Sequence, residues 1–141
     1  MASSRRQSRE AALQMLYLVD VSGIDIDKIP VAALSEEPMS PKTLEFARHL
    51  ASGVVGDWDR IDQLIKRQAH NWEMSRMAAI DRCILRLASF ELLKEHDTPV
   101  NVIINEAIEI AKKYSTAESS RFVNGILDKI KEERKNGQSG R

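Results

Sequence analysis

The chain has 141 residues, a length that suits one domain with its own core. Hydrophobic residues make up 43% and charged residues 30%, which excludes a disordered chain, and an aromatic content of 5% with few glycines and prolines disfavours a β-sandwich or barrel. Basic and acidic residues number 21 each. This balance excludes a protein that coats nucleic acid through bulk positive charge and leaves room only for a local basic patch.

Three features that the sequence lacks indicate the cellular compartment: a disulfide, a membrane span and a signal peptide. The single cysteine, Cys83, rules out an internal disulfide and suits a reducing environment. No apolar run approaches the roughly 18 residues that a membrane span needs. The basic N-terminus is not followed by the apolar stretch of a signal peptide. We therefore expect a cytoplasmic protein with no membrane association.

Apolar residues recur at intervals of three and four along most of the chain, which predicts helices throughout. Ser40 followed by Pro41 is a typical helix start, and Ser4 with Gln7 and Ser115 with Glu118 have the spacing of capping boxes. In chain order, the predicted helices cover about residues 4–21, 30–34, 41–56, 58–65, 76–95, 99–111 and 116–135. Short connections join them, so we expect one compact all-α domain over 1–141, with 1–4 and 135–141 mobile.

The segment 76–95 is apolar almost all round, which predicts the longest and most central helix. Arg82 and Arg86 lie one turn apart within it, and a nearly buried arginine needs a carboxylate, for which Glu91 and Glu106 are candidates. Gly125 interrupts the last helix, which indicates a closely packed neighbouring backbone more than a ligand contact.

No catalytic, metal or cofactor site is predicted. The three histidines lie in separate segments and form no metal-binding pair on one helix face. Three aspartates between positions 57 and 62 supply favourable charge at a helix N-terminus and lack the glycine and distal glutamate of a calcium loop. Cys83 falls in the apolar stripe and is expected to be a core residue.

The N-terminus carries the clearest functional pattern. Arg5, Arg6 and Arg9 fall in the first turns of the first helix, where cations oppose the helix dipole. The free N–H groups at that end and the three arginines both favour a bound anion. The pattern therefore indicates contact with the phosphates of RNA or DNA, against the alternative of a solvated basic tail.

Four segments together resemble the NusB family of bacterial transcription antitermination factors. They are SRRQSREAALQMLY at 4–17, NW followed by AIDRCILRLASFELL within 71–93, TPVNVIINEAIEIAKKYS at 98–115, and SSRFVNGILDKI at 119–130. The resemblance implies an all-helical fold of two small packed bundles and a non-enzymatic role. It also implies binding of boxA, a single-stranded element of nascent ribosomal RNA, together with NusE, a small-subunit ribosomal protein. With NusA and NusG on RNA polymerase, the complex would suppress termination.

The resemblance also implies the site residues. The implied RNA-binding residues are Arg5, Arg6, Arg9, Tyr17, Glu118, Arg121 and Phe122, and Asp81 is implied to face NusE. Gln7 stands where some relatives have arginine, so the basic patch is weaker here. The apolar stripe places Phe122 in the core and the family position places it at the RNA, and Tyr17 is expected to be half-buried.

Three alternatives remain open from the sequence. One is a homodimeric helical interaction module whose RNA surface is occluded. Another is the accessory domain of an rRNA cytosine methyltransferase, which shares the fold; no S-adenosylmethionine site occurs in the sequence, so we expect a freestanding factor. The third is a protein-interaction module without RNA contact.

Overall fold

The computed structural model describes residues 3–70 and 73–139, and within these ranges every regular element is a helix. The NW pair of the quoted motif, at 71–72, lies outside the described residues. Three short 3₁₀ helices are η1 (Ile26–Lys28), η2 (Val31–Leu34) and η3 (Met74–Arg76). The α-helices are α1 (Ser4–Ser22), α2 (Pro41–Gly56), α3 (Trp58–Gln68), α4 (Ala79–Lys94), α5 (Val100–Tyr114) and α6 (Ala117–Ser139).

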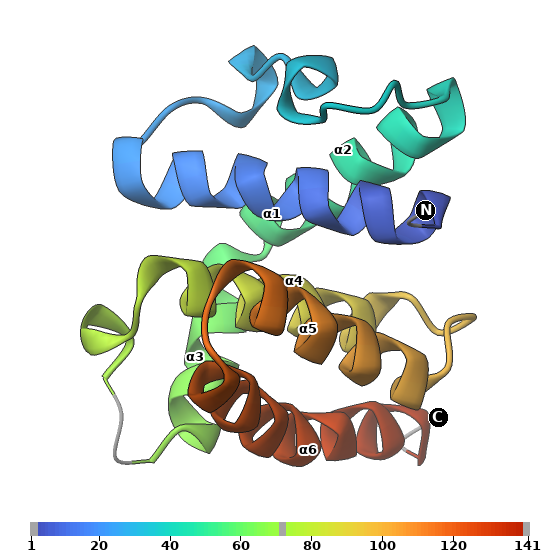
Figure 1. The fold of residues 1–141 in the computed structure, drawn as a ribbon. Coiled ribbons are helices and arrows are strands. Elements are labelled where there is room, and N and C mark those ends of the chain that lie inside the picture. Colours follow the sequence, from blue (N-terminus) through green and yellow to red (C-terminus); the bar gives the residue numbers. More distant parts are fainter. Residues whose placement is uncertain (1–2, 71–72, 140–141) are drawn as a thin grey trace.

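The helices form two packed groups, which confirms the all-α prediction (Figure 1). The group containing α1 and α2 lies above the group containing α4, α5 and α6 in that view, with α3 at one side. Helix α4 contacts each of the other five α-helices, so it is the central element that the apolar pattern predicted. Contrary to the prediction, it is not the longest helix. Helix α4 begins only at Ala79, after η3, and has 16 residues, whereas α6 has 23.

Six α-helices form instead of about seven, because the segment around residue 30 forms the 3₁₀ helix η2. Residues 135–139, expected in a mobile tail, continue α6 as helix. The side chain of Arg134 turns back to the C-terminus of α4, where it donates hydrogen bonds to four carbonyl oxygens, among them those of Leu92 and Glu95. It therefore stabilises the end of α4 and not the end of its own helix.

Of the three N-cap residues predicted from the sequence, one is correct and two are displaced by one residue. Ser40 Oγ accepts a hydrogen bond from the Thr43 N–H at 3.2 Å, as predicted. The cap of α1 is Ser3, whose Oγ accepts from the Arg6 N–H, and the cap of α6 is Thr116, whose Oγ1 accepts from the Ser119 N–H. At each of these two starts a second hydroxyl residue is adjacent to the cap, Ser4 in α1 and Ser115 before α6. The capping boxes predicted at Ser4 and Ser115 were therefore wrong.

The glycine that packs closely is Gly53 and not Gly125. A Cβ at Gly53 would lie 2.2 Å from Cζ of Phe90. Helices α2 and α4 therefore pack this closely only because Gly53 has no side chain. A Cβ at Gly125 would meet nothing within 4 Å, since this residue lies on the exposed face of α6. The expectation of close packing at Gly125 was therefore wrong.

A largely buried charge network, with Arg86 at its centre, joins α1, α3 and α4. Asp20 on α1 accepts hydrogen bonds from both Arg82 and Arg86, and Asp62 on α3 accepts two from Arg86. Burial disfavours the charged form of Asp20, but the hydrogen bonds from the two guanidinium groups outweigh it and lower its pKa. The two arginines thus pair with aspartates, and the predicted partners, Glu91 and Glu106, are used elsewhere.

Candidate nucleic-acid interface

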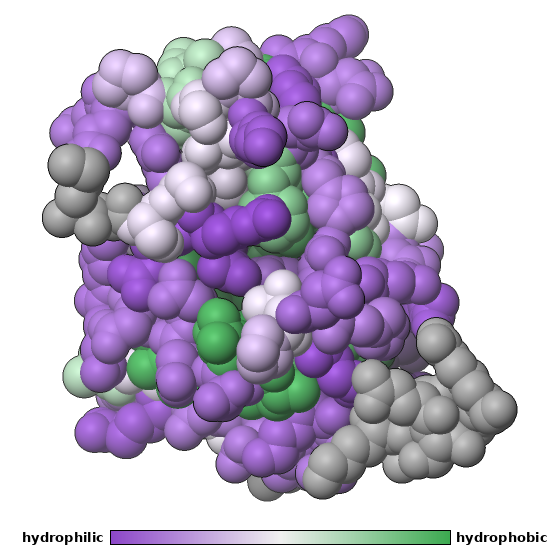
Figure 2. Space-filling view, turned by 90° about the vertical axis from the view of Figure 1, so that its right-hand side faces the viewer, coloured by the Kyte–Doolittle hydropathy of each residue, from purple (hydrophilic) through white to green (hydrophobic). Residues whose placement is uncertain are grey.

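The N-terminus of α1 holds three arginines in three different environments. Arg5 is exposed, and its guanidinium carbon lies 3.7 Å from the ring centroid of Phe46 on α2. The aromatic face attracts the cation and restricts its position while one side remains open to solvent. This end of the molecule is largely hydrophilic, with small hydrophobic areas between the polar ones (Figure 2).

Arg6 forms a two-pronged ion pair with Glu106 on α5. Its Nε lies 2.7 Å from Oε1 and its Nη2 lies 2.6 Å from Oε2, with the side chains 28% and 20% exposed. The hydrogen bonds from Arg6 lower the pKa of Glu106 despite its partial burial. Arg6 therefore reaches the surface with its charge already balanced.

Arg9, which the sequence predicted as a phosphate contact, lies in the interior, and this position weighs against such a contact. It is 4% exposed, and its Nε and Nη2 donate to the carboxylate of Glu91, itself 1% exposed, at 2.8–3.1 Å. Its Nη1 lies 3.6 Å from Oε1 of Glu106. The guanidinium joins α1 to α4 and α5, so in this conformation Arg9 supports the surface without being part of it.

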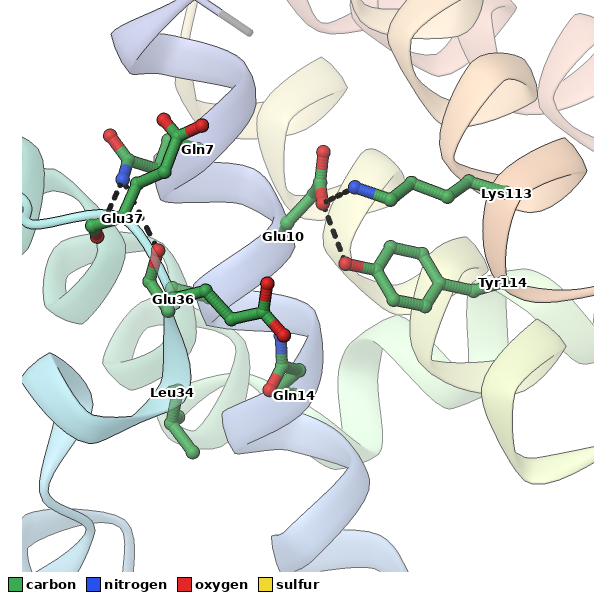
Figure 3. A pocket seen from close by; sticks show the side chains of 10 residues that line it. Gln7, Glu10, Gln14, Leu34, Glu36, Glu37, Lys113 and Tyr114 are labelled. Atoms are coloured by element: carbon green, nitrogen blue, oxygen red, sulfur yellow. Dashed lines mark hydrogen bonds and ion pairs between the residues drawn. The ribbon is translucent and has the colours of Figure 1, made fainter. Parts of the chain in front are cut away.

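A first hollow of about 420 Å³ lies beside the next turns of α1 (Figure 3). The Gln7 side-chain amide donates to Ser35 Oγ and to the Glu37 carbonyl oxygen, so Gln7 holds the loop before α2 in place. Across the hollow, Glu10 accepts hydrogen bonds from Lys113 Nζ and the Tyr114 hydroxyl, at 2.7 and 2.6 Å. Gln7 thus has a structural role at this position.

Two further hollows continue the first one toward α6. The second, of about 560 Å³, shares Gln14, Leu34 and Tyr114 with the first and is also lined by Tyr17. The third, of about 180 Å³, shares Ala78 with the second. Its lining also includes Arg76, Asp81, Glu118, Ser119 and Phe122. Through these shared lining residues the three hollows follow one another from Gln7 on α1 to Phe122 on α6, and we call this series the α1–α6 band.

The predicted aromatic and α6 residues occupy different positions along this band. Tyr17 is 40% exposed in its middle. Phe122 is half-buried: it packs against the core, as the apolar stripe predicted, and it also lines the third hollow, so its position at the RNA stays a prediction. Glu118 and Arg121 are exposed, and Glu118 lines the third hollow.

Asp81 is more deeply placed than a surface contact would be. It is 6% exposed, and its Oδ2 accepts a hydrogen bond from Ser119 Oγ at 2.9 Å. Its Oδ1 is buried and has no hydrogen-bond partner among the described residues. Asp81 therefore connects the start of α4 to the start of α6 at the wall of the third hollow.

Three residues of this region were not predicted from the sequence. Phe46, Lys113 and Tyr114 have ordinary helical positions, and only the tertiary fold brings them to the arginines and to Glu10. Glu106 was noticed but assigned to the wrong arginines. An acidic residue facing inward on a helix that carries no other buried charge is the signal for such a pair, and it does not identify the partner.

The described residues contain no metal site and no catalytic thiol. No three histidine, cysteine, aspartate or glutamate side chains gather in a way that suits a metal ion within the ranges 3–70 and 73–139. Burial, followed by the nearby charge of Asp20, raises the pKa of Cys83 to about 12, so this thiol is an inert core group. No described helix is long and apolar enough to cross a membrane.

Comparison with known proteins identifies the family. The NusB family profile matches residues 6–132. The transcription antitermination protein NusB of Bacillus subtilis is 43% identical over 127 residues, covering 90% of this chain and 94% of that protein. Its counterpart in Anaeromyxobacter dehalogenans is 46% identical over 132 residues, covering 92% of each.

Solved structures agree. T. maritima NusB superposes with a TM-score of 0.85 at 40% identity, covering 94% of each chain. A structure described as the antitermination factors NusB and NusE in complex with double-stranded RNA gives a TM-score of 0.83 at 25% identity, covering 94% of this chain and 98% of the other. The matched regions span α1 through most of α6, so the chain belongs to the NusB family.

Proposed function

We propose that this protein is a non-enzymatic transcription antitermination factor that binds RNA together with NusE. The observation that supports it best is the α1–α6 band, which runs from Gln7 in the second turn of α1 to Glu118 and Phe122 in the first turns of α6. The exposed Arg5, two residues before Gln7, and the exposed Arg121, next to Phe122 in the chain, supply charge for phosphates, while Tyr17 and Phe122 supply faces for unpaired bases. Relatives named as transcription antitermination proteins, and one solved in complex with NusE and RNA, support the same function.

The charge distribution supports a requirement for a partner. The first hollow is lined by Glu10, Glu36 and Glu37 against a single cation, Lys113, so its net charge repels phosphate. Arg6 is neutralised by Glu106 and Arg9 is buried. The free chain therefore has few phosphate contacts, and a partner that contributes positive charge completes the binding surface. NusE is that partner in the proposed complex, and Asp81, which lines the third hollow, is the residue that the proposal assigns to the NusE side.

The finer parts of the proposal follow from the family. The RNA is the single-stranded boxA element of a nascent ribosomal transcript, and the NusB–NusE–RNA complex acts with NusA and NusG on RNA polymerase. Unpaired bases suit the aromatic positions better than a duplex does. In a duplex the bases are already stacked on one another, and protein side chains cannot reach the base edges in its deep groove.

Fluorescence anisotropy of a labelled boxA RNA tests the proposal. The protein is titrated with and without NusE, against a scrambled single strand and a duplex of equal length. We expect weak binding by the protein alone and at least tenfold tighter binding with NusE, lost when Arg5, Tyr17 and Arg121 are replaced together. Absence of binding in both conditions would contradict the proposal, and sedimentation of the same sample would then show whether a homodimer covers the band.

A further inference from the structure

Glu106 lies at the point where the α1 arginines meet the second layer of helices. It accepts two hydrogen bonds from Arg6 and lies 3.6 Å from a third donor nitrogen, on Arg9. With Glu91 it completes a set of two carboxylates and two guanidinium groups whose net charge is zero. Among the described residues Arg5 alone of the three arginines has no carboxylate partner.

We infer that Glu106 sets how much positive charge this end of α1 offers to RNA, because its carboxylate competes with phosphate for Arg6. This inference rests on the proposed RNA-binding function. Both prongs of the guanidinium are directed at the carboxylate, so a phosphate that takes the same two N–H groups must replace Glu106. A phosphate that takes only the outer nitrogen, Nη1, meets a neutral pair instead of a cation. In either arrangement the charge of Glu106 weakens RNA binding.

The location of the pair explains why it affects binding as well as folding. The Arg9–Glu91 pair is almost fully buried and is out of reach of a ligand. The Arg6–Glu106 pair is part-exposed, so water and salt screen it and its net contribution to folding is small. A phosphate chain with several contacts can therefore compete with it.

Replacing Glu106 with glutamine tests the inference. Glu106→Gln keeps the shape and one acceptor oxygen while removing the charge. We expect the RNA affinity, measured with NusE present, to rise about threefold at low salt. The slope of log affinity against log salt should steepen by about 0.7, the value for one additional phosphate contact on a single strand. Since phosphate contacts carry no sequence information, a scrambled RNA should gain as much as boxA RNA.

Glu109→Gln is the matched control, because Glu109 is exposed on the same helix and acts on Arg6 only through space. It should change the slope by much less than 0.7, the single-strand increment. Equal gains from both variants would overturn the inference, because net charge alone would then explain them. A weaker affinity for Glu106→Gln in a protein that still melts near the wild-type temperature would also overturn it, since Glu106 would then orient Arg6 for RNA.

A second readout needs no RNA. The Arg6 Nε–H proton, held by the charged carboxylate of Glu106 in the free protein, should give an NMR signal that shifts clearly in Glu106→Gln, where only a neutral acceptor remains, and stays unchanged in Glu109→Gln. Its presence in wild type together with an unchanged RNA affinity in Glu106→Gln refutes the inference. Failure of wild-type protein to bind RNA in the presence of NusE refutes the proposed function itself.

Discussion

Replacing Arg9 with alanine separates the structural arginine from the surface arginines. The side chains of Arg9 and Glu91 are 5% and 2% exposed, so Arg9→Ala leaves a buried carboxylate without its counter-ion. Removal of one partner of a buried pair costs about 3 kcal/mol or more. For a chain of this size, about 3 kcal/mol corresponds to a fall in Tm of about 10 °C. Arg5→Ala, at an exposed position on the same helix, should cost less than about 1 kcal/mol.

Circular dichroism at 222 nm during heating gives both Tm values, and anisotropy at a temperature where both variants are folded gives RNA affinity. We expect Arg9→Ala to lower Tm and leave the salt dependence of RNA binding unchanged, while Arg5→Ala reduces the slope by about 0.7. Replacing both members of the pair, with Arg9→Met and Glu91→Leu, should restore most of the stability because no charge is then left unpaired. An unchanged Tm for Arg9→Ala with lost RNA affinity would refute this assignment.

Three further predictions concern the fold. Gly125→Ala should stabilise the protein by about 0.5–1 kcal/mol because the new methyl group meets no neighbouring atom. Gly53→Ala should destabilise it by about 1–3 kcal/mol because the new methyl group clashes with Phe90. Chemical denaturation measures both changes, and equal effects on the free energy of unfolding would contradict the packing. Asp20→Asn should lower the free energy of unfolding by about 3 kcal/mol, since Arg82 and Arg86 lose a shared counter-ion; a change below about 1 kcal/mol would show that the network is dispensable. The pKa values of Asp20 and Glu106 are lowered in the folded state, so the stability they contribute is fully present above their ordinary values of 3.8 and 4.5 and is lost as pH falls through the folded values. As the pH is lowered, the free energy of unfolding should therefore fall less steeply in Asp20→Asn than in wild type. Parallel curves for the two proteins would contradict the assignment.

The fold was predictable because its strongest signal is local. The apolar residues of 76–95 cover almost every side of a helix, and such a helix must be surrounded, which is what α4 shows. The start of α2 was predictable for the same reason, since Ser40 and Pro41 act within one turn. Where two hydroxyl residues are adjacent, at Ser3 and Thr116, local pattern does not choose between them and the predictions were displaced by one residue.

The charged pairs were not predictable, because they join residues far apart in the chain. Sequence spacing indicated that Arg86 needed a carboxylate but contained no information that Asp20 and Asp62 would reach it. The same limit affected the RNA site: Arg5 and Arg9 look alike in the sequence, and only the position of α1 on α4 exposes one and buries the other. Spacing therefore located the basic end of the molecule but not which arginines are available.

The most direct test of the central claim is an NMR shift map of the ¹⁵N-labelled protein, recorded as boxA RNA is added in the presence of unlabelled NusE and compared with NusE alone. We expect RNA-dependent shifts at both ends of the α1–α6 band, around Gln7 and around Phe122, and at Tyr17 between them. The exposed face of α3 should be unaffected. Shifts confined to α3, or to one end of the band, would contradict the claim that a single continuous surface binds the RNA.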